Sequence, residues 1–226
     1  MKALILCGGF GTRYNLNKKI KILKPLVKID KISILKRIMI KCKQEGIKEF
    51  ILLGGYKFNK LKKYTEKLKE FKIKILYTGL NTDTAGRLLK AKEFINKKEN
   101  FLFTYGDSFV DFSLKKNLQN KKSNNYVIST YNYKIPYGGL NLSNENILTK
   151  FLEKKAVIPI NAGFYILDDS IFSYIKSDKE SFEKTTINKI LNTKKKYFKC
   201  VEVKKWYPLD TYKDKVILEK FIKKQK

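Results

Sequence analysis

The residues best suited to chemistry stand at the end of the first apolar run of the chain. Residues 3–7 predict a strand buried on both faces, and three glycines follow it within Gly8 to Gly11. Because glycine has no Cβ, backbone N–H groups can approach a ligand closely, and the backbone can turn tightly. Thr12 adds a hydroxyl, and Arg13 adds a planar fork of donors that matches phosphate oxygens. The pattern indicates a phosphate-binding loop at the carboxyl end of a strand.

Spacing excludes two better-known glycine motifs. A dinucleotide-binding fingerprint requires a small residue three positions after Gly11, where this chain has Tyr14. A P-loop requires Lys followed by Ser or Thr after its last glycine, and the pair Thr12-Arg13 does not meet that requirement. On these residues alone, a glycine-rich turn that only lets the chain leave a sheet remains an alternative.

The chain contains no histidine, which narrows the chemistry that it can perform. Histidine is the usual general base, the commonest transition-metal ligand and the partner of a catalytic Ser or Cys. Any reaction must therefore use carboxylates, lysines, arginines, backbone dipoles or a hard metal ion.

Two aspartates could hold such a metal ion. Asp107 follows the apolar run 101–105. Asp210 likewise follows apolar residues, and it stands shortly before a C-terminal amphipathic stretch. Mg²⁺ is bound through one or two carboxylates and keeps positions for phosphate oxygens. Each aspartate also has a structural alternative, because Asp is a common N-cap of a following helix.

The order of the predicted elements indicates an α/β fold. Apolar runs typical of strands occupy residues 3–7, 49–53, 73–77 and 101–105, and stretches with helical periodicity at 34–42, 61–71 and 87–94 separate them. This alternation predicts a doubly wound, Rossmann-like, mostly parallel sheet flanked by helices, which binds ligands at the carboxyl ends of its strands. Gly55 falls at such an end, and residues 82–86 fall at a predicted helix N-terminus with unsatisfied N–H groups.

The charge of the chain is strongly positive. It has 50 Lys and Arg against 21 Asp and Glu, a formal net charge of +29, which suits anionic partners. The lysines are spread along the whole chain, so we favour nucleotides and other small anions over nucleic acid, which stays the alternative.

Three widely spaced cysteines indicate reduced thiols, and no apolar run approaches the ~18 residues of a membrane span. With no signal-peptide pattern, we expect a cytoplasmic protein without a membrane partner.

Several motifs, taken in order, resemble one family. They are Gly8 to Arg13, Lys24-Pro25, Gly106-Asp107, Glu153-Lys154, Asn161 to Gly163 and Asp210. The chain resembles the nucleotidyltransferases that make nucleotide sugars. The resemblance is closest to the glucose-1-phosphate cytidylyltransferases, through residues 82–88, 103–107 and 209–215.

The resemblance implies a function and a set of site residues. It implies the nucleotide-diphospho-sugar transferase fold and transfer of CMP from CTP to a phosphorylated small molecule, with release of pyrophosphate, for surface polysaccharide synthesis. Mg²⁺ would be the cofactor, held by Asp107 and Asp210, and Arg13, Lys24 and Lys154 would be catalytic. The implied nucleotide-binding residues are Leu6, Cys7, Gly8, Gly9, Gly11, Thr12, Arg13, Lys24, Gly55, Thr82, Gly86, Arg87, Tyr105, Gly106 and Asp107. The implied acceptor-binding residues are Gly138, Glu153, Lys154, Asn161 and Asp210.

We expect a single domain over residues 1–226, with a nucleotide-binding half at 1–112 and an acceptor-binding half at 113–226. Short strands within 126–169 would form a small β-rich region for the acceptor. A homo-oligomer stays open.

The chain departs from the glucose-1-phosphate enzymes on the acceptor side. The interval from Tyr64 to Thr78 leaves no room for an inserted segment of that family, Pro136 replaces an arginine, and Lys155 replaces a proline. The expectation of CTP is therefore firmer than that of glucose 1-phosphate, and phosphocholine or phosphoglutamine are alternative acceptors. Use of GTP, UTP or dTTP with a sugar 1-phosphate also stays open.

Overall fold

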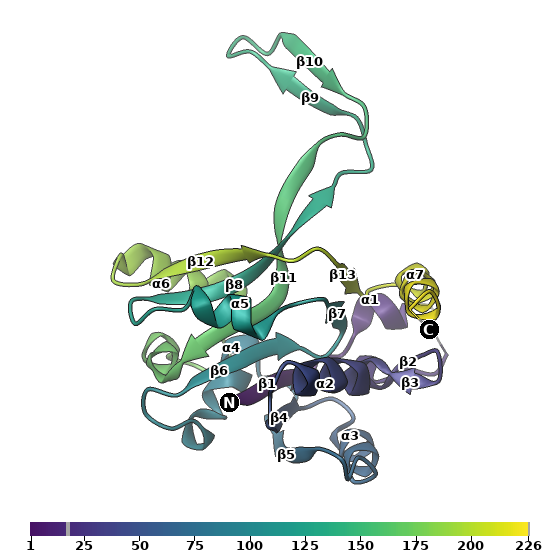
Figure 1. Ribbon diagram of the computed structural model, residues 1–226, viewed down its shortest axis with the longest axis vertical. Helices are drawn as coiled ribbons and strands as arrows, with labels where there is room; N and C mark the ends of the chain where they lie inside the picture. The colour runs from purple at the N-terminus through teal and green to yellow at the C-terminus, as the bar shows by residue number, and fades with distance from the viewer. Residues whose placement is uncertain (17–18, 226) are drawn as a thin grey trace.

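One seven-stranded sheet forms the centre of the protein. The structure is a computed structural model and describes residues 1–16 and 19–225. The strands follow the order β12-β8-β11-β6-β1-β4-β5, as Figure 1 shows. Their bounds are β1 (Lys2–Cys7), β4 (Glu49–Gly54), β5 (Lys72–Tyr77), β6 (Asn100–Tyr105), β8 (Asn125–Lys134), β11 (Val157–Asp168) and β12 (Tyr197–Glu202). Only β11 runs against its neighbours, so the prediction of a mostly parallel, doubly wound sheet is confirmed.

Helices cover both faces of this sheet, which explains why β1 is apolar from Ala3 to Cys7. Ala3 and Ile5 belong to a core cluster with side chains of α2 and α7, whereas Leu4 and Leu6 belong to a second cluster with α4 and α6. The α-helices are α1 (Thr12–Asn15), α2 (Ile34–Gln44), α3 (Phe58–Thr65), α4 (Thr84–Leu89), α5 (Leu114–Gln119), α6 (Ile187–Thr193) and α7 (Tyr212–Lys223). Because successive strand residues point to opposite faces, a strand between two helix layers needs apolar side chains on both.

Two predicted helices have different bounds in the structure. The helix expected at 87–94 begins earlier, at Thr84, because the Asp83 carboxylate accepts the Thr84 N–H and caps it. It ends at Leu89, and residues 92–94 form a separate turn, η2 (Lys92–Phe94). The helix expected at 61–71 ends at Thr65, although Leu68 and Phe71 remain buried in the turns that follow.

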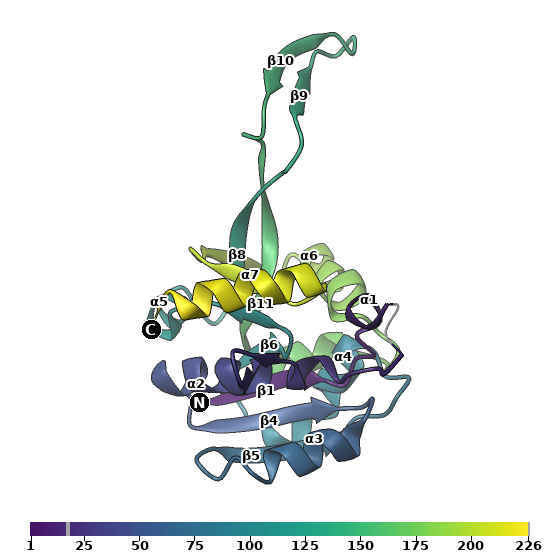
Figure 2. The ribbon, with the colours of Figure 1, turned by 90° about the vertical axis from the view of Figure 1, so that its right-hand side faces the viewer.

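The smaller strands build the rest of the molecule. β7 (Ser108–Val110) pairs with β13 (Trp206–Pro208), and β2 (Lys28–Ile29) pairs with β3 (Ile32–Ser33). Beyond the body, β8 and β11 continue as a two-stranded ribbon that ends in the hairpin of β9 (Gly139–Leu142) and β10 (Leu148–Leu152). Figures 1 and 2 show from two sides that this hairpin projects away from the helices and the sheet.

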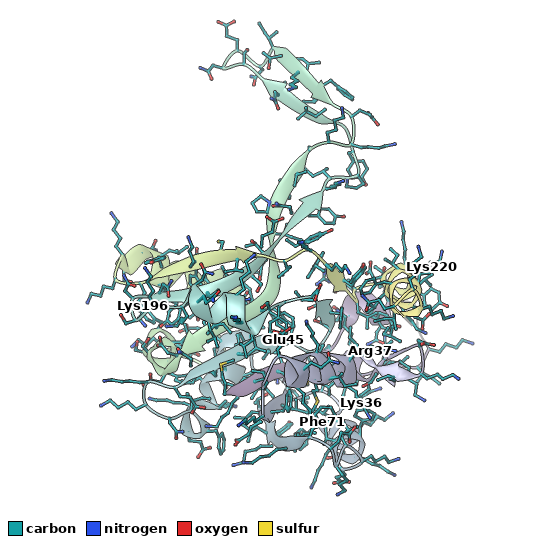
Figure 3. All side chains as sticks on the ribbon, viewed as in Figure 1. Lys36, Arg37, Glu45, Phe71, Lys196 and Lys220 are labelled. Atoms are coloured by element: carbon teal, nitrogen blue, oxygen red, sulfur yellow. The ribbon has the colours of Figure 1, made fainter. Side chains whose placement is uncertain are left out.

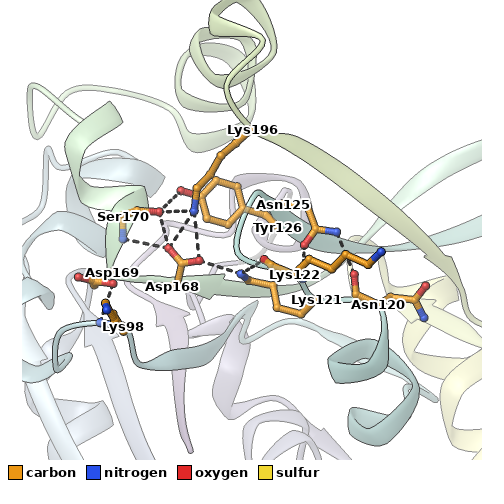
Figure 4. Close-up of polar contacts among 10 residues, drawn as sticks. All are labelled: Lys98, Asn120, Lys121, Lys122, Asn125, Tyr126, Asp168, Asp169, Ser170 and Lys196. Carbon is orange, nitrogen blue, oxygen red and sulfur yellow. Dashed lines mark hydrogen bonds and ion pairs between the residues drawn. The ribbon is translucent and has the colours of Figure 1, made fainter.

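A cluster of charged side chains joins β8, β11 and β12 at the end of the sheet where β11 terminates. Asp168 accepts a hydrogen bond from Lys121 at 2.7 Å and lies 3.2 Å from Lys196, whose ammonium also donates to the Ser170 hydroxyl (Figure 4). Burial alone would raise the pKa of Asp168, but hydrogen bonds from Lys121 and Ser170 and the two lysine charges lower it below its usual 3.8. The cluster therefore stabilises the fold while Asp168 is ionised.

We expect Asp168→Asn to lower the free energy of unfolding by about 3 kcal/mol, because two poorly exposed lysines lose their counter-charge. Since the pKa of Asp168 is lower in the folded state, its contribution is complete above pH 3.8 and is lost as the pH falls through the folded value. Denaturant unfolding at several pH values measures both effects. Asp169→Asn is the matched control: its amide oxygen can still accept the Lys98 N–H, so its stability should change little.

Candidate active site

A cleft of about 470 Å³ opens above the carboxyl ends of β1 and β6. Its walls come from the glycine loop after β1, the start of α4 and the residues after β6. The cleft is lined by Leu6, Cys7, Gly8, Gly9, Phe10, Gly11, Lys24, Pro25, Leu80, Asn81, Thr82, Asp83, Thr84, Arg87, Tyr105, Asp107 and Lys179. The carboxyl ends of neighbouring parallel strands meet there because β1 pairs with both β4 and β6.

Close packing fixes the glycine loop. The Gly106 N–H donates to the Leu6 carbonyl at 2.9 Å, and the Tyr56 N–H donates to the Gly8 carbonyl at 3.0 Å. A Cβ on Gly8 would lie 2.2 Å from the Arg87 guanidinium and 2.8 Å from the Gly55 nitrogen. Gly11 has φ 59°, a left-handed conformation that glycine adopts easily, and α1 begins immediately after it.

Arg87 forms the floor of the cleft. Its guanidinium donates to the Thr78 hydroxyl and to the carbonyls of Gly54, Gly79 and Leu80, and the residue is 5% exposed. These acceptors are neutral, and burial lowers the pKa of Arg87 from its usual value. Arg87 therefore holds the strand ends together and brings a positive charge to the floor of the cleft.

A chain of ion pairs closes one side of the cleft. The Lys24 ammonium lies 2.7 Å from an oxygen of Asp107 and 2.6 Å from an oxygen of Asp210, and its side chain is 8% exposed. The second oxygen of Asp210 lies 2.7 Å from Arg13, whose side chain is largely exposed. Four residues that are far apart in the sequence are thus brought together.

Strand pairing holds the two aspartates together, and neither is a helix cap. Asp107 leads into strand β7, and its carbonyl accepts the Leu209 N–H at 3.0 Å where β7 pairs with β13. The N-cap of α7 is Thr211, which forms a capping box with Asp214. The alternative of helix capping is therefore wrong for both Asp107 and Asp210, and their carboxylates face Lys24 instead.

The N-terminus of α4 differs from the expectation of free N–H groups. The Asp83 N–H donates to the Asp178 carbonyl at 2.9 Å, and the Ala85 N–H donates to the Glu180 carbonyl at 3.1 Å. A Cβ on Gly86 would lie 2.2 Å from Asp178. Gly86 therefore permits the close approach of the loop 176–181, which takes up these N–H groups.

The remaining predicted residues near the cleft have structural partners. The Thr82 hydroxyl donates to the Thr78 carbonyl at 2.5 Å. Burial raises the pKa of the Cys7 thiol, so that this thiol remains protonated. Thr12 is exposed at the start of α1. The Asn161 amide donates to the Tyr165 hydroxyl, which lies 3.4 Å from the hydroxyl of Tyr105 in the cleft wall.

Three predicted acceptor residues are not brought to this cleft. Gly138, Glu153 and Lys154 belong to the projecting hairpin and the turn after β10, where Lys154 forms an exposed ion pair with Glu153 at 3.6 Å. The prediction assigned the segment 126–169 to the binding of the acceptor, whereas the long pairing of β8 with β11 carries the middle of this segment away from the body.

Sequence reasoning missed residues that the second half of the chain supplies. Lys179 lines the cleft, and Glu183 lies behind it, where its carboxylate accepts hydrogen bonds from Tyr105 and from Thr84 at 2.9 Å. Burial raises the pKa of Glu183 above its usual value. Neither residue follows a predicted strand, so the pattern that located the other residues gives no signal for them.

Comparison with known proteins identifies relatives that span most of the chain. The sequence profile of the nucleotidyl transferase family matches residues 2–224. Glucose-1-phosphate cytidylyltransferase of Salmonella typhi is 30% identical over 247 residues, covering 97% of this chain and 95% of that protein. D-glycero-alpha-D-manno-heptose 1-phosphate guanylyltransferase of Campylobacter jejuni is 34% identical over 188 residues, covering 81% and 83%. Among solved structures, HddC from Yersinia pseudotuberculosis complexed with GMP-PN shares the fold, with a TM-score of 0.77 at 24% identity over 98% of this chain and 99% of that one.

We expect Gly8→Ala to destabilise the protein by about 1–3 kcal/mol, because the new methyl group would overlap the Arg87 guanidinium and the Gly55 backbone. Gly9→Ala is the matched control, since nothing lies within 4 Å of its Cβ position. Thermal unfolding of both variants measures the difference. Equal midpoints would contradict the close packing described for this loop.

Proposed function

The chain belongs to the nucleotidyl transferase family, and on that premise we propose that it is a cytidylyltransferase that transfers CMP from CTP to a phosphorylated small molecule. The products would be pyrophosphate and a CDP-activated compound. A sugar 1-phosphate is the first acceptor to test, because the Salmonella typhi and Campylobacter jejuni relatives are named for such acceptors.

One observation carries the proposal: Lys24 lies between Asp107 and Asp210 at the side of the cleft that the glycine loop forms. Arg13 extends the same group of charges toward solvent. A triphosphate in the cleft would meet backbone N–H groups of the loop, the ammonium of Lys24 and the guanidinium of Arg13. These are the donors that an anionic leaving group requires.

The donor set at this place fits Mg²⁺. Asp107 and Asp210 supply hard carboxylate oxygens, and among the described residues no cluster of three or more His, Cys, Asp or Glu side chains offers a complete metal site. Such a two-carboxylate arrangement suits an ion that takes its other ligands from substrate phosphates and water. Asp107 and Asp210 would hold the ion, and the bound ion would neutralise charge on the phosphates.

The reaction needs no general base, in agreement with the absence of histidine. A phosphate monoester has its second pKa near ~6, so its oxygen is already anionic at neutral pH. That oxygen would attack the α-phosphorus in line, and the bond from the α-phosphorus to the bridging oxygen would break, releasing pyrophosphate. Lys24 and Arg13 would orient the phosphates and stabilise the charge that develops on the leaving group.

The identity of the nucleotide, CTP, is a separate part of the proposal. Residues 82–88 resemble the cytidylyltransferases, whereas the relatives include a guanylyltransferase as well as cytidylyltransferases. We expect pyrophosphate release with CTP to exceed that with GTP, UTP and dTTP when Mg²⁺ and a panel of sugar and non-sugar phosphates are supplied. A preference for GTP with a sugar 1-phosphate would replace the cytidylyl assignment and keep the reaction.

A nucleic-acid-binding function is the alternative from another class. Figure 3 labels Lys36, Lys196 and Lys220, which come from α2, the segment before β12 and α7, so these three cations do not belong to one element. A nucleic-acid-binding protein would bind single strands with an affinity that falls steeply with salt and would release no pyrophosphate.

We expect Asp107→Asn to abolish turnover, because the carboxamide removes the negative charge that faces Lys24 and would hold the metal ion. Pyrophosphate release at saturating Mg²⁺ measures the loss. Asp111→Asn is the matched control, because Asp111 is an exposed aspartate four residues later that pairs with Lys41 outside the cleft. Near-normal activity of the Asp107 variant would remove the metal assignment.

A further inference from the structure

Lys24 contacts the same carboxylate oxygens that a metal ion at Asp107 and Asp210 would need. Its ammonium lies 2.7 Å from Oδ2 of Asp107 and 2.6 Å from Oδ1 of Asp210. Oδ2 of Asp210 lies 2.7 Å from the Arg13 guanidinium, so three of the four oxygens already contact a cation of the chain itself. Since Mg²⁺ binds such oxygens at ~2.0–2.1 Å, an ion that bridges both carboxylates has to compete with Lys24 or Arg13 for at least one oxygen.

The charges around the two carboxylates cancel. Two cations face two carboxylates in this group, and the whole chain carries a formal charge of +29. A divalent cation is attracted by an excess of negative charge, which neither the group nor the chain supplies. Two cations a few ångströms apart also repel each other strongly in a partly buried site, so the carboxylate pair can hold the ammonium or the metal ion.

The base of the Lys24 side chain is fixed, whereas its end contacts only the charged groups. The backbone of Lys24 lies in the turn η1 (Lys24–Leu26), where the Val27 N–H donates to the Lys24 carbonyl at 3.0 Å. The stem of the side chain packs on the glycine loop, because a Cβ on Gly11 would lie 3.3 Å from the Lys24 Cβ and 3.6 Å from its Cδ. Lys24 also lines the cleft. Rotation of its last side-chain bonds would therefore turn the ammonium from the carboxylates toward a phosphate while the loop stays in place.

We propose that the Lys24 ammonium keeps a divalent cation off Asp107 and Asp210 until a triphosphate enters the cleft. The phosphate oxygens would then accept hydrogen bonds from Lys24 and Arg13, and the carboxylates that these cations leave would hold the ion. Lys24 and the metal ion thus exchange places on the same two carboxylates. The inference rests on the proposed function, because it takes the ligand of the cleft to be a nucleoside triphosphate.

Titration of the full chain with Mn²⁺ in the absence of nucleotide tests the exchange. Mn²⁺ takes the same oxygen ligands as Mg²⁺, and its electron paramagnetic resonance signal measures the unbound ion. Lys24→Met should bind Mn²⁺ at least about tenfold more tightly than the wild type, because it removes a positive charge from the carboxylate pair. Lys179→Met is the matched control: it removes the same charge from the same cleft, but the Lys179 ammonium donates to the Asn81 carbonyl, so the Mn²⁺ affinity should not change.

Further variants locate the bound ion and control for a loss of folding. Adding Asp107→Asn to Lys24→Met should abolish the gain in affinity, because one of the two carboxylates is lost. Lys24→Gln keeps a hydrogen-bond donor between the carboxylates and should tighten Mn²⁺ binding in the same direction as Lys24→Met. If either Lys24 variant is less stable, Mn²⁺ should raise its thermal midpoint by more than that of the wild type, since the ion replaces the missing cation.

Equal Mn²⁺ affinities of the wild type and Lys24→Met would overturn the exchange, and so would a gain in affinity that survives Asp107→Asn. Neither result affects the proposed reaction, which pyrophosphate release by the wild type measures separately. A wild-type chain that releases no pyrophosphate with CTP, GTP, UTP or dTTP would remove the proposed function and the triphosphate as the trigger. A gain in Mn²⁺ affinity in Lys24→Met would still show that Lys24 excludes the ion.

Discussion

The ammonium of Lys24, held between Asp107 and Asp210, is the interaction on which the site depends. Two carboxylates placed close together in a partly buried cleft repel each other, and a cation between them makes the arrangement stable. The geometry needs three separate parts of the fold: the turn that contains Pro25, the end of β6 and the strand β13 before α7. The fold therefore positions the ammonium and the two carboxylates beside one another at the side of the cleft.

The second constraint is the tight packing of glycines around Arg87. Gly8, Gly55 and Gly86 each leave no room for a side chain, although what they make room for differs. Gly8 and Gly55 surround the guanidinium, whereas Gly86 lies against the backbone of Asp178. The cleft therefore owes its shape to the absence of side chains as much as to the donors that line it.

Much of the fold could be predicted from the sequence because its strands are continuous apolar runs that end in glycine or polar residues. The same rule located Gly8, Asp107 and the stretch 82–86, since the carboxyl ends of parallel strands meet at one edge. It could not find Lys179 or Glu183, because the loop 176–181 and the helical turn η4 (Phe182–Thr186) reach the cleft only through long-range packing. It also could not foresee that Glu153 and Lys154 would lie on a projecting hairpin, since local alternation of residues does not reveal how far two paired strands extend beyond a sheet.

The late position of Asp210 has a consequence for synthesis of the protein. The four parallel strands β1, β4, β5 and β6 are complete by Tyr105, and a nascent chain of that length already contains the glycine loop and Lys24. It still lacks the loop 176–181 that covers α4 and the second carboxylate on Lys24. The complete cleft, with Asp210 facing Lys24, therefore requires nearly the whole chain.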